Sequence, residues 1–301
     1  MTIDDFLQER PWLLADGATG TNLFDRGLTS GEAPDLWNES RPEEIRRLHR
    51  DFVAAGADII LTNSFGANAR RLKLHDAEDR AHAINELAAR HARAVVDEQV
   101  REIVVAGSVG PTGDLFAPLG ELTEDAAVEV FVEQIEGLKD GGADVIWIET
   151  MSALEEMRAA ATAASLVGMA YVVTASFDTA GSTMMGISPA AMADGTSHFS
   201  PAPRAFGCNC GVGASDLVCS VLAMTEAFPD AVVVAKANCG IPVVKGDTVS
   251  YSGTPVLMAD YARLAVDAGA RIVGGCCGTT ATHRAWSITS WGMPLSGVAI
   301  T

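Results

Sequence analysis

The chain has 301 residues, of which 48% are apolar and 20% are charged, and its formal net charge at pH 7 is −18. This is the composition of a folded globular protein with a large core. The length suits one domain, since α/β barrels of about 250 residues commonly form a single domain. So acidic a surface repels phosphate backbones and anionic lipids, which argues against nucleic acids and membrane surfaces as partners.

The N-terminal sequence MTIDDFLQERPWLLADG carries acids where a signal peptide needs bases. No apolar run in the chain reaches the roughly 18 residues of a membrane span. We therefore expect a cytoplasmic protein whose six cysteines are reduced.

Eight short, nearly continuous apolar runs recur along the chain, and helix-like segments separate them. Continuous apolar character predicts parallel strands that are covered on both faces. The segments between them carry helix start signals, such as Pro42 at one start and Thr123 as the predicted N-cap of another. The expected strands lie within residues 12–17, 58–66, 103–111, 144–150, 171–177, 205–211, 232–240 and 270–278.

This alternation predicts a single α/β domain over residues 1–301, a (β/α)8 TIM barrel. An open doubly wound sheet is the alternative, but no G-x-G-x-x-G opens the first helix. Residues 178–203 are expected to combine a loop with a short helix. The last helix, within ATHRAWSITSWGMPLSGVAIT, is expected to be weak or truncated.

Thiols gather at the ends of two predicted strands, where the functional residues of a barrel sit. The sixth strand ends in GCNCG and the eighth in GGCCGTT. Three thiolates and one open position are typical of a catalytic zinc site, and the glycines around Cys276 and Cys277 let both bind one ion. Cys208 and Cys210 point to the same side of an extended strand, so spacing does not choose between them. Cys210 is preferred as the third ligand because it lies nearer the rim.

Two other readings of the cysteines stand beside zinc: ordinary packing of small buried side chains, and redox chemistry through a vicinal disulfide. The spacing is not that of a structural C-x2-C…C-x2-C zinc site. An open three-thiolate zinc would bind an incoming thiol and deprotonate it, which suits alkylation of that thiol.

Six sequence blocks point to a known family: DGATGTNL at 16, AGADIILTNSFGAN, GSVGPTG, DVIWIETMSALEE, GCNCG, and GGCCGTT at 274. With them, the chain resembles the zinc-dependent homocysteine S-methyltransferases. These include betaine–homocysteine methyltransferase and the homocysteine-binding module of cobalamin-dependent methionine synthase. The resemblance implies Zn2+ held by Cys210, Cys276 and Cys277, with the homocysteine sulfur at the fourth position and Cys208 as a non-ligand.

The resemblance also implies how the rest of homocysteine is held. Acids matching Asp16 and Glu149 would bind its ammonium group, which is reasonable chemistry for two carboxylates. Other residues are expected to bind the carboxylate through backbone N–H groups or to line the site, whereas two histidines are expected on the surface. The carboxylate-binding residues are Gly17, Ala18 and Thr19, the lining residues are Phe65, Asn209 and Asn238, and the histidines are His49 and His75.

The implied reaction moves a methyl group from a small donor to the homocysteine thiol and gives methionine. Betaine or a related onium compound is the expected donor. Betaine enzymes hold the trimethylammonium group in an aromatic cage, and in them a tyrosine follows the phenylalanine of the block matching TNSFGAN. Here that residue is Gly66. Trp37, Phe65 or Trp147 would have to compensate, although Trp37 could equally hold a loop in place and Trp147 could belong to the core.

Alternatives remain for donor and class. The chain could use S-methylmethionine, or act as the stand-alone homocysteine module of a split methionine synthase whose methyl group comes from a separate corrinoid protein. A non-catalytic zinc-binding barrel is the alternative of a different class. The resemblance fixes no oligomeric state.

Overall fold

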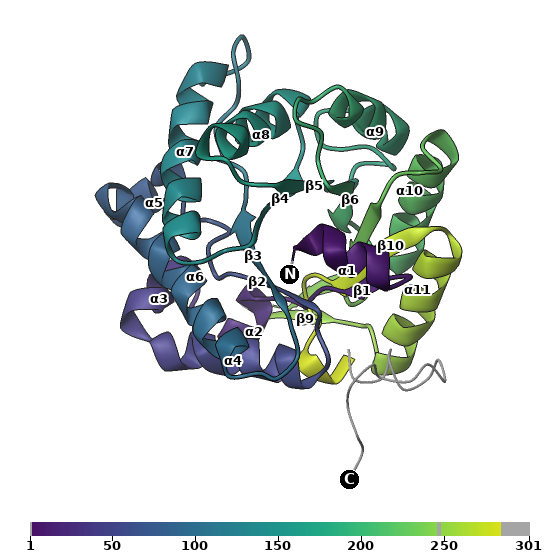
Figure 1. The fold of residues 1–301 in the computed structure, drawn as a ribbon, viewed down its shortest axis with the longest axis horizontal. Coiled ribbons are helices and arrows are strands. Elements are labelled where there is room, and N and C mark those ends of the chain that lie inside the picture. The colour runs from purple at the N-terminus through teal and green to yellow at the C-terminus, as the bar shows by residue number, and fades with distance from the viewer. Residues whose placement is uncertain (1, 246–247, 284–301) are drawn as a thin grey trace.

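The computed structural model describes residues 2–245 and 248–283, and eight parallel strands in them form one sheet. The strand order is β1-β10-β7-β6-β5-β4-β3-β2, and a parallel bridge between Ala15 and Ile59 brings the two ends together. The result is a barrel with its strands at the centre (Figure 1). The strands are β1 Leu13–Leu14, β2 Ile59–Leu61, β3 Val104–Val109, β4 Val145–Met151, β5 Tyr171–Ala175, β6 Ala205–Cys210, β7 Val233–Ala237 and β10 Ala270–Gly275.

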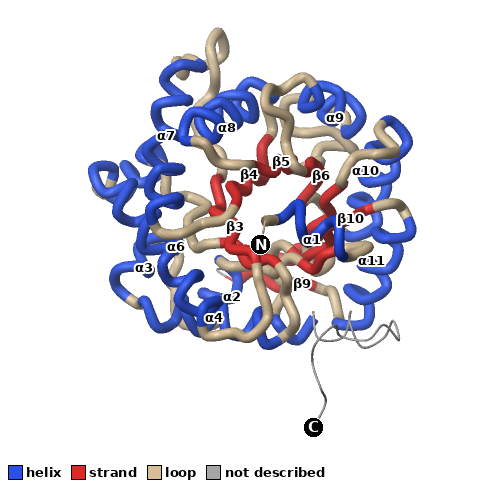
Figure 2. The backbone as a smooth tube through the Cα atoms, viewed as in Figure 1, coloured by secondary structure: helices blue, strands red, loops and turns tan. Residues whose placement is uncertain are grey.

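Helices surround the strands, as the outer blue ring in Figure 2 shows. The predicted (β/α)8 barrel is confirmed, each predicted strand range overlaps an observed strand, and the open-sheet alternative is wrong. The helices are α1 Ile3–Glu9, α2 Gly20–Phe24, α3 Trp37–Ser40, α4 Pro42–Ala54, α5 Ala69–Leu72, α6 Ala81–Asp97, α7 Glu124–Asp140, α8 Leu154–Val167, α9 Pro189–Ser197, α10 Ala214–Ala227 and α11 Pro255–Asp267. Short 3-10 turns lie at Pro34–Leu36, Lys73–His75 and Glu78–Arg80.

Local sequence signals set several helix boundaries. Pro42 is the first residue of α4, and the Thr123 side chain caps α7 by accepting the N–H of Ala126. Both positions are those in which these residue types stabilise a helix start. The short helix expected within residues 178–203 is α9.

The barrel interior changes from apolar to polar along the strands. Alternate residues of each strand point inward, and near the strand starts they include Val104, Trp147, Val172 and Val234, which pack with Phe6 of α1. Because α1 packs on these first inward residues, it covers the N-terminal end of the barrel, where Figure 1 shows it. Further along β3 to β7, the inward side chains are buried and polar: Ser108, Glu149, Thr174, Asn209 and Lys236.

One insertion in the barrel was not predicted. A hairpin of β8 (Pro242–Lys245) and β9 (Thr248–Tyr251) lies between β7 and α11. The predicted last helix falls mostly on residues 284–301, outside the described part of the chain. Among the described residues, no helix is both long enough and apolar enough to cross a membrane.

Candidate active site

Three cysteines from two strands converge at the C-terminal rim of the barrel. The Sγ atoms of Cys210, Cys276 and Cys277 all lie within 4.8 Å of one another, and those of Cys210 and Cys277 are 3.8 Å apart. Two sulfurs on one tetrahedral zinc, at Zn–S distances of about 2.3 Å, are separated by about 3.8 Å. The number, type and spacing of these donors therefore fit a zinc ion.

The fourth thiol of the two motifs is not part of this group. Cys208 is 1% exposed and packs between the barrel and its outer helices, with its Sγ 3.8 Å from the carbonyl oxygen of Leu217. Cys208 and Cys210 were expected to point the same way, and this is wrong. Cys210 has φ of +64°, and Gly211 after it has φ of +74°. This left-handed backbone breaks the alternation of β6 at its last residue.

Asn238 braces the loops that carry the thiols. Its Nδ2 donates to the carbonyl oxygen of Gly211 at 2.7 Å, and its Oδ1 accepts the N–H of Cys277 at 3.0 Å. The amide of Asn238 thus ties the end of β6 to the loop after β10, and its hydrogen bonds are made to the thiol-bearing loops.

Asn209 joins β4 and β5 to the thiol site. Its Oδ1 accepts the N–H of Thr150 at 2.9 Å and the hydroxyl of Thr174 at 2.7 Å. Its Nδ2 donates to the hydroxyl of Thr150 at 2.7 Å and lies 3.8 Å from the Sγ of Cys276. One side chain therefore fixes the strand end that carries Glu149 relative to a thiol.

The hairpin contributes Tyr251 to the same site. Hydrogen bonds from Cys210, Cys276 and Tyr251 lower the pKa of Cys277 to about 3. Hydrogen bonds with Cys276 and Cys277 raise the pKa of Cys210. Negative charge thus concentrates on one sulfur. Gly278 has φ of +79°, and a Cβ there would clash with the Tyr251 ring. Glycine is therefore required at this position both for its backbone conformation and for lack of space.

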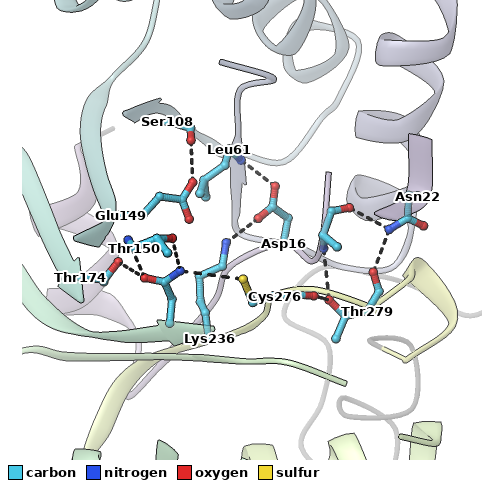
Figure 3. Close-up of polar contacts among 12 residues, drawn as sticks. Asp16, Asn22, Leu61, Ser108, Glu149, Thr150, Thr174, Lys236, Cys276 and Thr279 are labelled. Carbon is cyan, nitrogen blue, oxygen red and sulfur yellow. Dashed lines mark hydrogen bonds and ion pairs between the residues drawn. The ribbon is translucent and has the colours of Figure 1, made fainter. Parts of the chain in front are cut away.

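The two predicted acids lie in the polar layer beside the thiols (Figure 3). Asp16 accepts the N–H of Leu61 at 2.7 Å, and Glu149 accepts the hydroxyl of Ser108 at 2.5 Å. Burial raises the pKa of Glu149 to about 7, although the nearby charge of Lys236 opposes this rise.

Lys236 is the site residue that sequence reasoning missed. It is 2% exposed, and its Nζ lies 2.9 Å from Asp16 Oδ1 and 5.6 Å from the centre of the Trp147 ring. Burial disfavours its charged form, but the carboxylates of Asp16 and Glu149 outweigh this and raise the pKa of Lys236. The available signal was a lysine inside the apolar strand VVVAKANCG.

The predicted carboxylate-binding amides are not equivalent. The N–H of Ala18 already donates to Thr279, at 3.3 Å to its carbonyl oxygen and 3.1 Å to its hydroxyl. The N–H groups of Gly17 and Thr19 make no hydrogen bond to residues 2–245 or 248–283. Phe65 is 37% exposed, and its ring lies against Gly110.

The structure decides between the alternatives for two tryptophans and corrects the expectation for one histidine. Trp37 is 4% exposed and Trp147 is completely buried, so neither can form a wall of an open cage. His49 is 1% exposed and not on the surface, because it lies one helical turn after Ile45 on the buried face of α4. Both ring nitrogens of His49 lack a hydrogen-bond partner among the described residues. His75 is partly exposed, close to the expectation.

The arrangement defines a TIM-barrel protein with a thiol-rich, metal-competent site at the rim where such barrels carry out their chemistry. The sequence model of one family, described as Homocysteine S-methyltransferase, matches residues 13–285. The chain belongs to the homocysteine S-methyltransferase family.

Curated relatives include methionine synthases that are much longer than this chain. That of Mycobacterium tuberculosis is 31% identical over 298 residues, which cover 93% of this chain and 24% of the relative. That of Mycobacterium leprae is 29% identical over 289 residues, with 90% and 24% covered. The chain thus spans about a quarter of the length of these relatives.

A solved structure shares the fold over nearly the whole chain. The metallated form of the homocysteine methyltransferase MmuM from Escherichia coli superimposes with a TM-score of 0.79 at 24% sequence identity. The match covers 95% of this chain and 98% of that one.

Proposed function

We propose that the protein is a zinc-dependent methyltransferase that transfers a methyl group to the thiol of homocysteine and releases methionine. The observation that carries this proposal is the cluster of three cysteines whose sulfur atoms are spaced for zinc. Asn209 and Thr150 connect this cluster to the buried acid Glu149. Family membership supports the same substrate. A thiol site and an ammonium site side by side are what a thiol-bearing amino acid requires.

Cys210, Cys276 and Cys277 would hold the zinc, which when bound lowers the pKa of an incoming thiol so that its sulfur reacts as a thiolate. Asn209 and Asn238 keep the three ligands in place.

Other residues would bind the amino-acid end of homocysteine. The ammonium group binds in the acidic layer that contains Asp16 and Glu149, and the N–H groups of Gly17 and Thr19 are available to the carboxylate. The homocysteine sulfur then forms a bond to the methyl carbon, and the electrons of the breaking bond leave with the donor. Phe65 follows β2, and its partly exposed ring lies against Gly110, which follows β3.

We propose betaine or a related onium compound as the methyl donor. The exposed ring of Phe65 and the ring of Tyr251, beside Cys277, offer aromatic faces that attract an onium group. The tyrosine of betaine enzymes is not reproduced at Gly66. That residue donates its N–H to Asp35 at 3.0 Å, and a Cβ there would lie only 3.0 Å from Asp35 Oδ2. A cage in this protein must therefore use other residues.

A second candidate is a stand-alone homocysteine module that takes its methyl group from a separate corrinoid protein. The observation that favours it is the 31% identity with a methionine synthase over 93% of this chain.

A donor panel tests these functions. Zinc-loaded protein is mixed with homocysteine under reducing conditions and then with betaine, a dimethylsulfonio compound, S-methylmethionine or methylcobalamin. Methionine is quantified by mass spectrometry, with Cys276→Ala as the matched control. Methionine from one onium donor supports the proposal, whereas methionine from methylcobalamin alone favours the corrinoid route.

A binding measurement separates an enzyme from a non-catalytic zinc barrel. Zinc storage does not require the Glu149 carboxylate, whereas binding of an amino acid does require it. Glu149→Gln should leave the zinc content unchanged and weaken homocysteine binding. Equal homocysteine affinity in the variant and the wild type would contradict the substrate assignment.

A further inference from the structure

The acidic pair that the proposed function assigns to the substrate ammonium already holds an ammonium group from the protein itself. Lys236 projects inward from β7, and its Nζ lies 2.9 Å from Asp16 Oδ1, with both side chains 2% exposed. The fold makes room for this lysine at Gly274, where a Cβ would lie 3.0 Å from Lys236 Cγ. The lysine is therefore built into the polar layer.

The two acids differ in what remains available to a ligand. Both oxygens of Asp16 are engaged, Oδ1 by Lys236 and Oδ2 by the N–H of Leu61 at 2.7 Å. Glu149 accepts one hydrogen bond, from Ser108 to Oε1, and makes no other among the described residues. Glu149 is 8% exposed and Asp16 is 1% exposed, so a ligand at the rim meets Glu149 first.

Charge leads to the same division. The ion pair of Asp16 with Lys236 is neutral as a unit, whereas Glu149 has Ser108 as its hydrogen-bond donor and no cation in hydrogen-bond contact. A second ammonium group placed on Asp16 would lie beside Lys236 and be repelled by it. An ammonium group on Glu149 would pair with the carboxylate that still lacks a bonded cation.

We propose that Lys236 is the cation that Asp16 binds, and that Glu149 is therefore the carboxylate that receives the ammonium group of the amino-acid thiol. This inference rests on the proposed function. Lys236 is in this view a positioning residue: it fixes Asp16 and leaves the substrate contact to Glu149. The conclusion follows from the contact that Lys236 of β7 makes with Asp16.

Two ligands that differ only in the amino group test the proposal. Homocysteine and 4-mercaptobutyrate carry the same thiol and carboxylate, so the ratio of their dissociation constants reports the contribution of the ammonium group. Calorimetry on zinc-loaded wild type should show a preference for homocysteine of about 10- to 100-fold, the size of one charged hydrogen bond.

Two variants separate the acids. Glu149→Gln should bring the ratio close to one. The double variant Asp16→Asn/Lys236→Met removes one charge of each sign and should keep the ratio within about threefold of wild type. If the double variant loses the preference as Glu149→Gln does, Asp16 binds the substrate directly and the inference is overturned. If wild type itself does not bind homocysteine, the proposed function is contradicted. That result differs from a wild type that binds homocysteine and a double variant that has lost the preference, which contradicts the inference alone.

A structure of wild type with zinc and homocysteine bound gives a readout that does not depend on how any variant folds. Lys236 Nζ is expected to stay within hydrogen-bond distance of Asp16, with the substrate ammonium on Glu149. Displacement of Lys236 by the substrate ammonium would overturn the inference. Zinc content and circular dichroism of each variant report whether its site and fold are intact.

Discussion

Asn209 and Thr150, which lie 59 residues apart in sequence, are joined by two hydrogen bonds in opposite directions, and the same amide reaches the sulfur of Cys276. Thr150 has φ of +62°, an uncommon conformation for a β-branched residue. The amide therefore holds a strained strand end against a thiol. Such outer contacts of metal ligands influence metal affinity.

Replacing Asn209 with alanine should weaken zinc binding by about 10- to 100-fold, because the Cys276 side chain loses its support. The N–H of Thr150 and the hydroxyl of Thr174 would also lose their partner, at a cost of about 1–3 kcal/mol in the free energy of unfolding. Competition with a chelator measures the first effect and urea unfolding the second. Thr174→Val is the matched control, since it removes one of these hydrogen bonds and leaves the contact to Cys276. Equal zinc affinity in Asn209→Ala and wild type would contradict the supporting role.

Removing one of the three converging cysteines should strip the metal, whereas removing Cys208, two residues before Cys210, should not. Cys276→Ala leaves two thiols, too few for a three-thiolate site, so we expect the purified protein to lose its zinc. Cys208→Ala is the control, because Cys208 packs outside the barrel away from the group. Zinc per chain is measured by elemental analysis. Stoichiometric zinc in Cys276→Ala would rule out the three-thiolate site.

Breaking the buried ion pair from one side should destabilise the protein strongly. Lys236→Met leaves the carboxylate of Asp16 buried without its cation, and we expect a loss of about 3–5 kcal/mol in the free energy of unfolding. The double variant Asp16→Asn/Lys236→Met should recover most of this loss, because a pair of neutral side chains avoids burying an unpaired charge. Urea unfolding of the metal-free proteins measures both. A double variant that is less stable than Lys236→Met would contradict this account.

The stability of the metal-free protein should depend on Glu149 in a defined pH window. Burial raises the pKa of this carboxyl from 4.5 to about 7. Between these values the folded protein holds a proton that the unfolded chain has lost, so wild-type stability falls as pH rises through the window. Glu149→Gln lacks this titration. Its stability relative to wild type should rise across the window and level off above it, by up to about 3 kcal/mol.

Urea unfolding at several pH values from about 5 to about 8 tests this prediction. The control is Glu155→Gln, an exposed position in the first turn of α8, which tests the effect of the amide substitution itself. A difference between Glu149→Gln and wild type that stays constant with pH would contradict the assignment.

The fold and the three thiols could be predicted because short, local patterns carry them. Continuous apolar runs predict buried parallel strands, and GCNCG and GGCCGTT place cysteines at two strand ends near each other in the barrel. The direction of Cys210 could not be predicted in the same way. It depends on one left-handed residue that breaks the strand periodicity.

The partners of Lys236 could not be predicted from the sequence, for a different reason. A lysine within an apolar strand signals a buried charge, but Asp16 lies 220 residues away and meets it only across the closed barrel. The burial of His49 was not predicted because the apolar residues of its helix form a complete periodic pattern without it. His49 nevertheless shares the buried face of the helix with Ile45. The hairpin that carries Tyr251 has strands of four residues, too short for a clear period-two pattern.

Helix α1 has a consequence for the order of events during turnover. It packs against the inward residues at the N-terminal ends of the strands, Trp147 among them, and this apolar layer closes that end of the barrel in the described residues. In the proposed reaction, the thiol substrate, the methyl donor and both products would then use the same rim. Because the methyl group would pass directly from the donor to the bound thiol, both ligands would have to occupy this rim together. The expected kinetic signature is a sequential mechanism, with a ternary complex before any product appears.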